Sequence, residues 1–90
     1  MGRGRVMVAD PAVGIRKWLI ENYGLDGDRL QSSTPLFTSG WLDSFNFVEV
    51  VTEFERSSGL RVNPLDWNFE NFDTLDKMAA YAAREASANS

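Results

Sequence analysis

The segment "SGWLDSFNFVEVV", residues 39–51, places an Asp-Ser pair between a polar loop and a run of large apolar side chains. Besides one Gly and one Trp, the segment holds six further large apolar residues. Ser44 could be an ordinary first residue of a helix, or it could carry chemistry. The chain contains no histidine that could activate a hydroxyl, so any chemistry at Ser44 needs another explanation.

The apolar residues after Ser44 recur at the spacing of one helix face. They stand at positions i, i+3, i+4 and i+7, which is the pattern of a buried stripe. The stripe consists of Phe47, Val50, Val51 and Phe54. Asp is a good N-cap and Gly a common left-handed stop. The sequence therefore predicts a helix from Ser44 to about Ser57, capped by Asp43 and ended by Gly59.

A second set of side chains on this helix is expected to point away from the core. At about 100° per residue, Phe45, Val48, Glu49 and Thr52 lie opposite the stripe. Outward apolar residues beside an acid suit a transient interface with a basic, partly apolar partner. We predict a partner-binding surface from these four residues and Glu53, although a solvated helix face explains the two glutamates equally well.

The residues before this segment predict another helix and a long loop. Asp10-Pro11 combines a cap with a proline at the first helical position, and Gly24 supplies the stop of a helix over residues 11–23. Residues 25–42 are rich in Gly, Asp, Ser, Thr and Pro, which favours an irregular loop. Its apolar residues, expected to return to the core, are Leu30, Leu36, Phe37 and Trp41. Loops of this length are often functional.

The second half of the chain predicts two more helices. Asn63-Pro64 repeats the cap-plus-proline signal and predicts a short helix through "LDWNF", residues 65–69. Asp73 and Thr74 are expected to open the last helix. The narrow apolar stripe of that helix consists of Leu75, Met78, Ala79 and Ala82.

No segment shows the alternation of a strand, so the predicted fold class is all-α. We expect a small four-helix bundle with three principal helices, one short helix and a long first loop. One domain should cover residues 10–86, between flexible tails at residues 1–9 and 87–90. We expect the segment "REASANS", residues 84–90, to trail off after the last helix.

Composition and charge narrow the possible functions. Hydrophobic residues make up 43% of the chain and charged residues 24%, values typical of a soluble globular domain. With no transmembrane segment and no secretory signal, we expect a cytoplasmic protein without a membrane partner. The absence of Cys and His removes disulfides, thiolate catalysis, Cys-type zinc sites and the commonest general base. We therefore predict no catalytic residue and no metal ligand.

The net charge of −4 is concentrated in the second half of the chain. Residues 1–42 hold five basic and four acidic side chains, whereas residues 43–90 hold four basic and nine acidic ones. Such an acidic surface repels nucleic acid and attracts basic proteins. Nucleic acid is therefore not an expected partner.

The Asp43-Ser44 pair allows three interpretations. In the first, the pair is only a helix cap and a polar first-turn residue. A hydrolase nucleophile is disfavoured, because the G-x-S-x-G motif and the histidine are both missing. In the third, Ser44 accepts a phosphate ester from another enzyme, at a helix start that favours an anion. That role requires no base within this chain.

The stretch "GWLDSFNFVEVVTEFERSSGLRV" resembles the signature of the acyl carrier protein family. In that signature an Asp-Ser-Leu triplet begins the second helix and an acidic residue follows five places after the Ser. "TPLFTSGWLDS" resembles the end of the family's first loop and "FDTLDKMAAYAA" its last helix, so the resemblance covers about Pro11 to Ala83. It implies a freestanding carrier protein that is not itself an enzyme.

By this resemblance, Ser44 carries a 4′-phosphopantetheine arm, and Asp43 belongs to the same motif. The arm's thiol would hold a cargo as a thioester and present it to partner enzymes. The implied partners are a phosphopantetheinyl transferase, an acyl- or aminoacyl-loading enzyme and a downstream transferase or synthase. A small helical interaction module without covalent modification is the competing interpretation.

Two departures from the family pattern bear on the cargo. Phe45 replaces the usual Leu, and Arg56 interrupts the acidic run in the second half of the helix. The segment "DWNFENFDT" resembles the third-helix region of aminoacyl and D-alanyl carriers. Polyketide or fatty-acyl cargo and aminoacyl or D-alanyl cargo both stay open, with a specialised biosynthetic pathway preferred. The roles of Trp41 and Trp67, as core residues or as walls of the cargo's path, also stay open.

Overall fold

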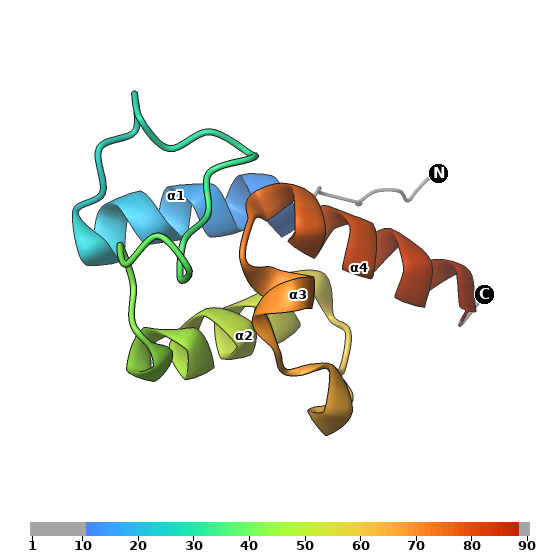
Figure 1. Cartoon of the computed structure of the whole chain (residues 1–90). Helices are drawn as coiled ribbons and strands as arrows, with labels where there is room; N and C mark the ends of the chain where they lie inside the picture. The colour runs from blue at the N-terminus through green and yellow to red at the C-terminus, as the bar shows by residue number, and fades with distance from the viewer. Residues whose placement is uncertain (1–10, 89–90) are drawn as a thin grey trace, which may run out of the picture.

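Four helices and one 3₁₀ turn form the regular structure of residues 11–88, the part of the chain that the computed structural model describes (Figure 1). In chain order they are α1 (Pro11–Tyr23), α2 (Ser44–Ser58), the 3₁₀ turn η1 (Pro64–Asp66), α3 (Phe69–Phe72) and α4 (Leu75–Ala88). No strand occurs in this part of the chain, and the predicted all-α bundle with a long first loop is confirmed. The predicted cap Asp10 and the tail at residues 1–9 lie outside the described residues.

The core lies where α1 packs against α2 and α4, with α3 closing one side against α4 (Figure 1). The predicted stripe of α2 is buried, as are Leu75 and Met78 of α4, so these core assignments are confirmed. Aromatic rings fill the space between α2, α3 and α4. Phe72 contacts Phe54 with ring centroids 5.2 Å apart and Tyr81 at the same separation. Such pairs contribute about 0.5–1.5 kcal/mol each beyond their burial.

Both principal helix ends that the sequence marked with glycine are confirmed. Gly24 follows α1 with φ 67° and donates its N–H to the Ile20 carbonyl at 3.0 Å. Gly59 follows α2 with φ 76° and donates to the Glu55 carbonyl at 2.9 Å. A side chain at either position would be strained, because residues other than glycine rarely adopt this left-handed conformation.

The short third helix was predicted with the wrong shape. The sequence indicated one helix through residues 65–69, whereas the chain forms η1 and then restarts as α3. Asn63 caps η1 by accepting the Leu65 N–H, and Asn68 caps α3 by accepting the Asn71 N–H at 3.1 Å. Asn side chains compete with helix propagation by binding nearby backbone groups, which explains the interruption.

The last helix also differs from its prediction at both ends. Thr74 caps it, since its hydroxyl accepts the Lys77 N–H at 3.0 Å, but the carboxylate of Asp73 points to the first loop instead. The helix continues to Ala88, so the first part of "REASANS" is helical rather than a tail. The helix-favouring residues Ala, Arg and Glu in this segment explain the extension.

A buried hydroxyl joins α4 to the η1 turn. Tyr81 donates its hydroxyl to Asp66 Oδ2 at 2.8 Å. Burial, together with the hydrogen bond to the Asp66 carboxylate, raises the pKa of Tyr81 to about 12. The η1 segment is therefore held against α4 although α3 is only one turn long.

The long loop between α1 and α2 has no regular structure, yet it is well packed. Leu30, Leu36, Phe37 and Leu42 are all buried, which confirms the prediction that apolar loop residues return to the core. Trp41 and Trp67 are partly buried at the edge of the core. The loop also needs partners for its backbone N–H groups, because it has no ladder or helix to satisfy them.

Asp73 supplies these partners from the junction of α3 and α4. Its Oδ1 accepts the N–H groups of Phe37 and Thr38 at 2.8 and 3.1 Å, and its Oδ2 accepts the Thr38 hydroxyl at 2.6 Å. The Asp73 carbonyl accepts the Leu36 N–H at 2.7 Å. Burial alone would raise the pKa of the Asp73 carboxyl, but the hydrogen bonds from Thr38 and the loop backbone hold it below its ordinary value.

We expect Asp73→Ala to lower the free energy of unfolding by about 2–3 kcal/mol, because buried N–H groups lose a charged acceptor. Urea titration followed by helical circular dichroism measures this loss. Asp28→Ala is the matched control, since the exposed Asp28 side chain lies in the same loop and accepts no hydrogen bond from another described residue. A loss of equal size in both variants would contradict the anchoring role of Asp73.

The contribution of Asp73 should also depend on pH. Its native pKa is lowered, so its stabilisation is fully present above the unfolded value of about 3.9 and disappears as the pH falls through the lower native value. The stability difference between wild type and Asp73→Ala should therefore shrink in acid. A difference that stays constant from neutral pH to below that range would show that the carboxylate charge is not involved.

Candidate functional site

The start of α2 is fixed by a reciprocal pair of hydrogen bonds. Asp43 has an extended backbone, and its Oδ1 accepts the Asn46 N–H at 2.9 Å. Asn46 returns the contact, because its Oδ1 accepts the Asp43 N–H at 3.2 Å. This is a capping box, which satisfies two donors of the helix start. Asp43 is therefore the predicted cap, and Ser44 is the first residue of the helix.

The Ser44 side chain is exposed to solvent. Its hydroxyl makes no hydrogen bond to another residue in the described part of the chain. The N–H groups of Ser44 and Phe45 are also without an acceptor among residues 11–88, as expected for the first turn of a helix. Unpaired N–H groups and the positive end of the helix dipole favour an anion here. The position suits a phosphate ester, and with no histidine in the chain it does not suit a self-activated nucleophile.

The outward side chains of α2 lie where the sequence placed them. Phe45 is 75% exposed and Val48 is 51% exposed, and Glu49 and Thr52 are exposed as well. Thr52 donates its hydroxyl to the Val48 carbonyl at 2.8 Å, so this hydroxyl is satisfied within the helix. We call Phe45, Val48, Glu49 and Thr52 the outer face of α2. It begins one residue after Ser44.

Glu49 is held in place by α1. The Tyr23 hydroxyl donates to Glu49 Oε1 at 2.5 Å, and the Asn46 amide approaches the same oxygen at 3.4 Å. Burial and the Glu49 carboxylate both raise the pKa of Tyr23, which keeps the phenol protonated as a donor. The carboxylate of Glu49 is thus connected both to α1 and to the first turn of α2.

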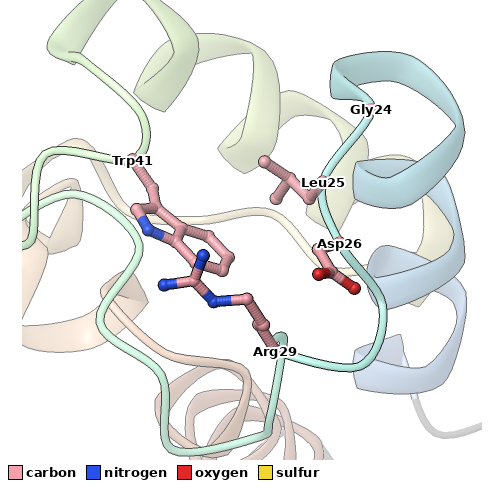
Figure 2. Close-up of a pocket in the computed structure, with 5 residues that line it drawn as sticks. All are labelled: Gly24, Leu25, Asp26, Arg29 and Trp41. Carbon is pink, nitrogen blue, oxygen red and sulfur yellow. The ribbon is translucent and has the colours of Figure 1, made fainter.

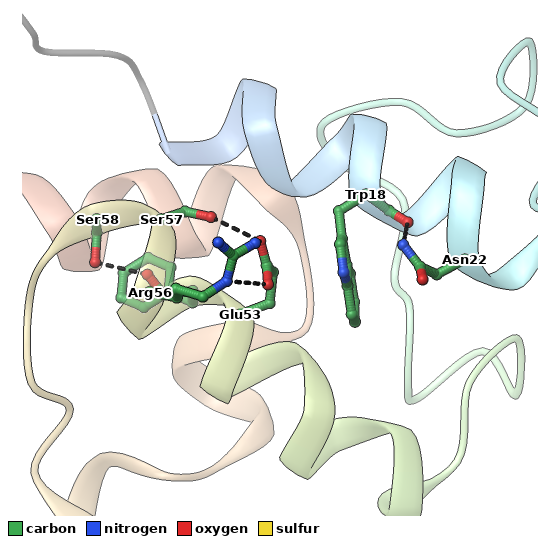
Figure 3. A network of polar contacts seen from close by, with 7 residues as sticks. Trp18, Asn22, Glu53, Arg56, Ser57 and Ser58 are labelled. Atoms are coloured by element: carbon green, nitrogen blue, oxygen red, sulfur yellow. Dashed lines mark hydrogen bonds and ion pairs between the residues drawn. The ribbon is translucent and has the colours of Figure 1, made fainter.

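Glu53 does not join the outer face, and its predicted accessibility is wrong. The residue is only 9% exposed, and its carboxylate forms a two-point contact with the Arg56 guanidinium at 2.9 and 2.6 Å (Figure 3). Ser57 donates its hydroxyl to the same carboxylate at 3.0 Å. Glu55 is also used internally, since it accepts the Val62 N–H at 2.8 Å. Of the three glutamates of α2, only Glu49 presents charge on the outer face.

Several residues that shape this region are not indicated by the sequence pattern used for the prediction. Asn46 carries the second half of the capping box, and its position three residues after Asp43 was an available signal, although Glu or Gln is usual there. Asp73 contacts the loop before the site and Tyr23 contacts Glu49, both from distant segments, and no local pattern indicates such contacts.

A pocket opens beside the loop that leads to Ser44. It has a volume of about 280 Å³ and is lined by Gly24, Leu25, Asp26, Arg29 and Trp41 (Figure 2). The Arg29 guanidinium lies over the Trp41 ring, 5.7 Å from its centroid. Trp41 is thus a wall of this pocket as well as an edge of the core.

No helix among the described residues is long and apolar enough to cross a membrane.

No curated protein and no solved structure matches the chain significantly. A family model described as a phosphopantetheine attachment site matches residues 14–82, which run from α1 into α4 and include all of α2. Members of this family attach a 4′-phosphopantetheine group, and the free Ser44 hydroxyl at a helix start fits such a phosphodiester. The chain therefore belongs to the phosphopantetheine-attachment family of acyl carrier-type proteins, as the resemblance in its sequence indicated.

Proposed function

We propose that Ser44 is the attachment site and that the arm carries an acyl or aminoacyl group as a thioester between partner enzymes. The observation that supports this is the exposed Ser44 hydroxyl, which is free of hydrogen bonds to other described residues at the first position of α2. When bound, the arm supplies the thiol that the cysteine-free chain lacks. The protein itself is then a carrier and not an enzyme.

The modification needs no base from this chain. The Ser44 oxygen bonds to the phosphorus of coenzyme A that bears the pantetheine, and the adenosine bisphosphate leaves. The hydroxyl proton goes to a base of the phosphopantetheinyl transferase. The chain contributes an accessible oxygen, and the first-turn N–H groups of α2 stabilise the resulting anion.

Carrier proteins of this family work with a phosphopantetheinyl transferase and with loading and downstream enzymes. We propose that the outer face of α2 meets these partners, because its apolar side chains surround Glu49 next to Ser44. We propose that these partners belong to a specialised biosynthetic pathway, which the single charge of the outer face and the exposed Phe45 support. A cytoplasmic location is part of the same proposal. The outer face has less charge than the sequence suggested, so apolar contacts should dominate recognition.

Incubation with a broad-specificity transferase and coenzyme A should add one phosphopantetheinyl group to the wild-type chain and none to Ser44→Ala. Intact-mass spectrometry measures both. Ser33→Ala is the matched control, since Ser33 is exposed in the loop and makes no hydrogen bond to another described residue. If the mass of the wild type does not change, or Ser44→Ala gains the same mass, the chain is an unmodified interaction module instead.

Val48→Lys and Glu49→Lys should each raise the transferase KM by about tenfold while helical content stays constant. Val48→Lys puts a positive charge in place of an apolar contact, and Glu49→Lys reverses the charge of the outer face. Tyr23→Phe separates the two effects at Glu49, since it removes the hydrogen bond but leaves the charge. We expect a smaller change in KM for Tyr23→Phe than for Glu49→Lys. Unfolding of the Lys variants would place these side chains in the core and overturn the assignment.

A further inference from the structure

The pocket at the first loop lies close to the proposed attachment site. Trp41 forms one wall and precedes Ser44 by three residues, which places their Cα atoms no more than about 11 Å apart. An extended phosphopantetheine arm is longer than this distance. An arm attached at Ser44 can therefore fold back so that its cargo reaches the pocket.

Arg29 is the positively charged group of this pocket, and its side chain is exposed to solvent. Its guanidinium stacks on Trp41 and makes no ion pair and no hydrogen bond to another described residue. Arg has five N–H donors in a planar fork that matches a carboxylate. The contact with Trp41 holds the guanidinium beside the pocket, where its solvated donors can bind a ligand (Figure 2).

The other residues that line the pocket limit the chemical class and the size of the ligand. Asp26 supports the turn, since its Oδ1 accepts the Asp28 N–H at 2.9 Å and its carbonyl accepts the N–H groups of Arg29 and Leu30, while its carboxylate forms no ion pair with Arg29. Leu25 and the Trp41 ring offer apolar contact to a short methylene chain. A volume of about 280 Å³ lies just below the usual range of ligand pockets, and the pocket is open to solvent, so it can hold a short acyl group but cannot enclose a long fatty acyl chain.

We propose that this pocket holds a short acyl group with a terminal carboxylate, borne on the arm at Ser44, with the carboxylate on Arg29 and the methylene groups against Leu25 and Trp41. This inference rests on the proposed function, because the arm delivers the ligand. An aminoacyl group lying against Leu25 and Trp41 would bring its ammonium next to the guanidinium, where like charges repel, so it would have to turn to the Asp26 carboxylate instead. The pocket therefore favours a carboxyacyl cargo over an aminoacyl cargo.

The test compares three cargoes of similar length, transferred to Ser44 from the corresponding coenzyme A thioesters: succinyl, butyryl and β-alanyl. Intact mass first establishes loading. The indole N–H signal of Trp41, assigned with Trp41→Phe among the three tryptophans, then reports on the pocket by NMR. We expect this signal to shift, relative to the unloaded arm, with succinyl and much less with butyryl or β-alanyl.

Arg29→Gln should abolish most of the succinyl-dependent shift, because loss of a charge-assisted hydrogen bond lowers pocket occupancy by about tenfold. Arg84→Gln is the matched control, since Arg84 also stacks on an aromatic ring, 5.1 Å from the Tyr81 centroid, but does not line the pocket. Equal shifts for the three cargoes, or a succinyl shift that survives in Arg29→Gln, would overturn the proposal while leaving Ser44 as the carrier site. Absence of the mass increase would instead remove the proposed function and this inference with it.

Discussion

The contact on which the site most depends is the one between the Asp73 carboxylate and the first loop. Twenty residues separate α1 from α2, and none of them belongs to a helix or strand. Asp73 gives that loop a charged, buried acceptor for three donors at Phe37 and Thr38. Just beyond these residues the chain turns, and Leu42 donates its N–H to the Leu36 carbonyl at 2.9 Å. The junction of α3 and α4 therefore fixes where the chain enters α2 at Ser44.

Helix α2 both packs into the core and presents an exposed apolar face. Its inner stripe is fully packed among aromatic rings, whereas its outer face keeps Phe45 and Val48 exposed. Exposed apolar area costs solvation free energy that the core must offset. The capping box and Gly59 fix the two ends of the helix, so that the inner and outer sets cannot exchange by a shift of the helix start. Tyr23 then fixes Glu49 relative to α1.

Helical periodicity predicted the bounds of α1 and α2, the buried stripe and the outward position of Phe45 and Val48, because these features depend on neighbours within one helix. Contacts between distant segments were not predictable in this way. The partners of Asp73 lie 35 and 36 residues away, and Tyr23 lies 26 residues from Glu49. Glu53 shows a further limit: it lies one turn after Val50, at the edge of the stripe, where the helical period alone does not decide whether a side chain is solvated. The family motif placed Ser44 correctly at the start of α2, but only the structure shows that its hydroxyl is free.

Asp43 caps the helix, and the adjacent Ser44 keeps its hydroxyl free; one side chain could not do both. A Ser at the N-cap position would use its hydroxyl oxygen to accept a first-turn N–H. Here Asp43 accepts that N–H from Asn46, so the hydroxyl of the next residue stays free of the helix backbone. Moving Ser one turn further into α2 would take it away from the unpaired N–H groups and the positive end of the dipole. The first helical position, directly after a carboxylate cap, is thus where a serine oxygen is both accessible and next to donors that stabilise an attached phosphate.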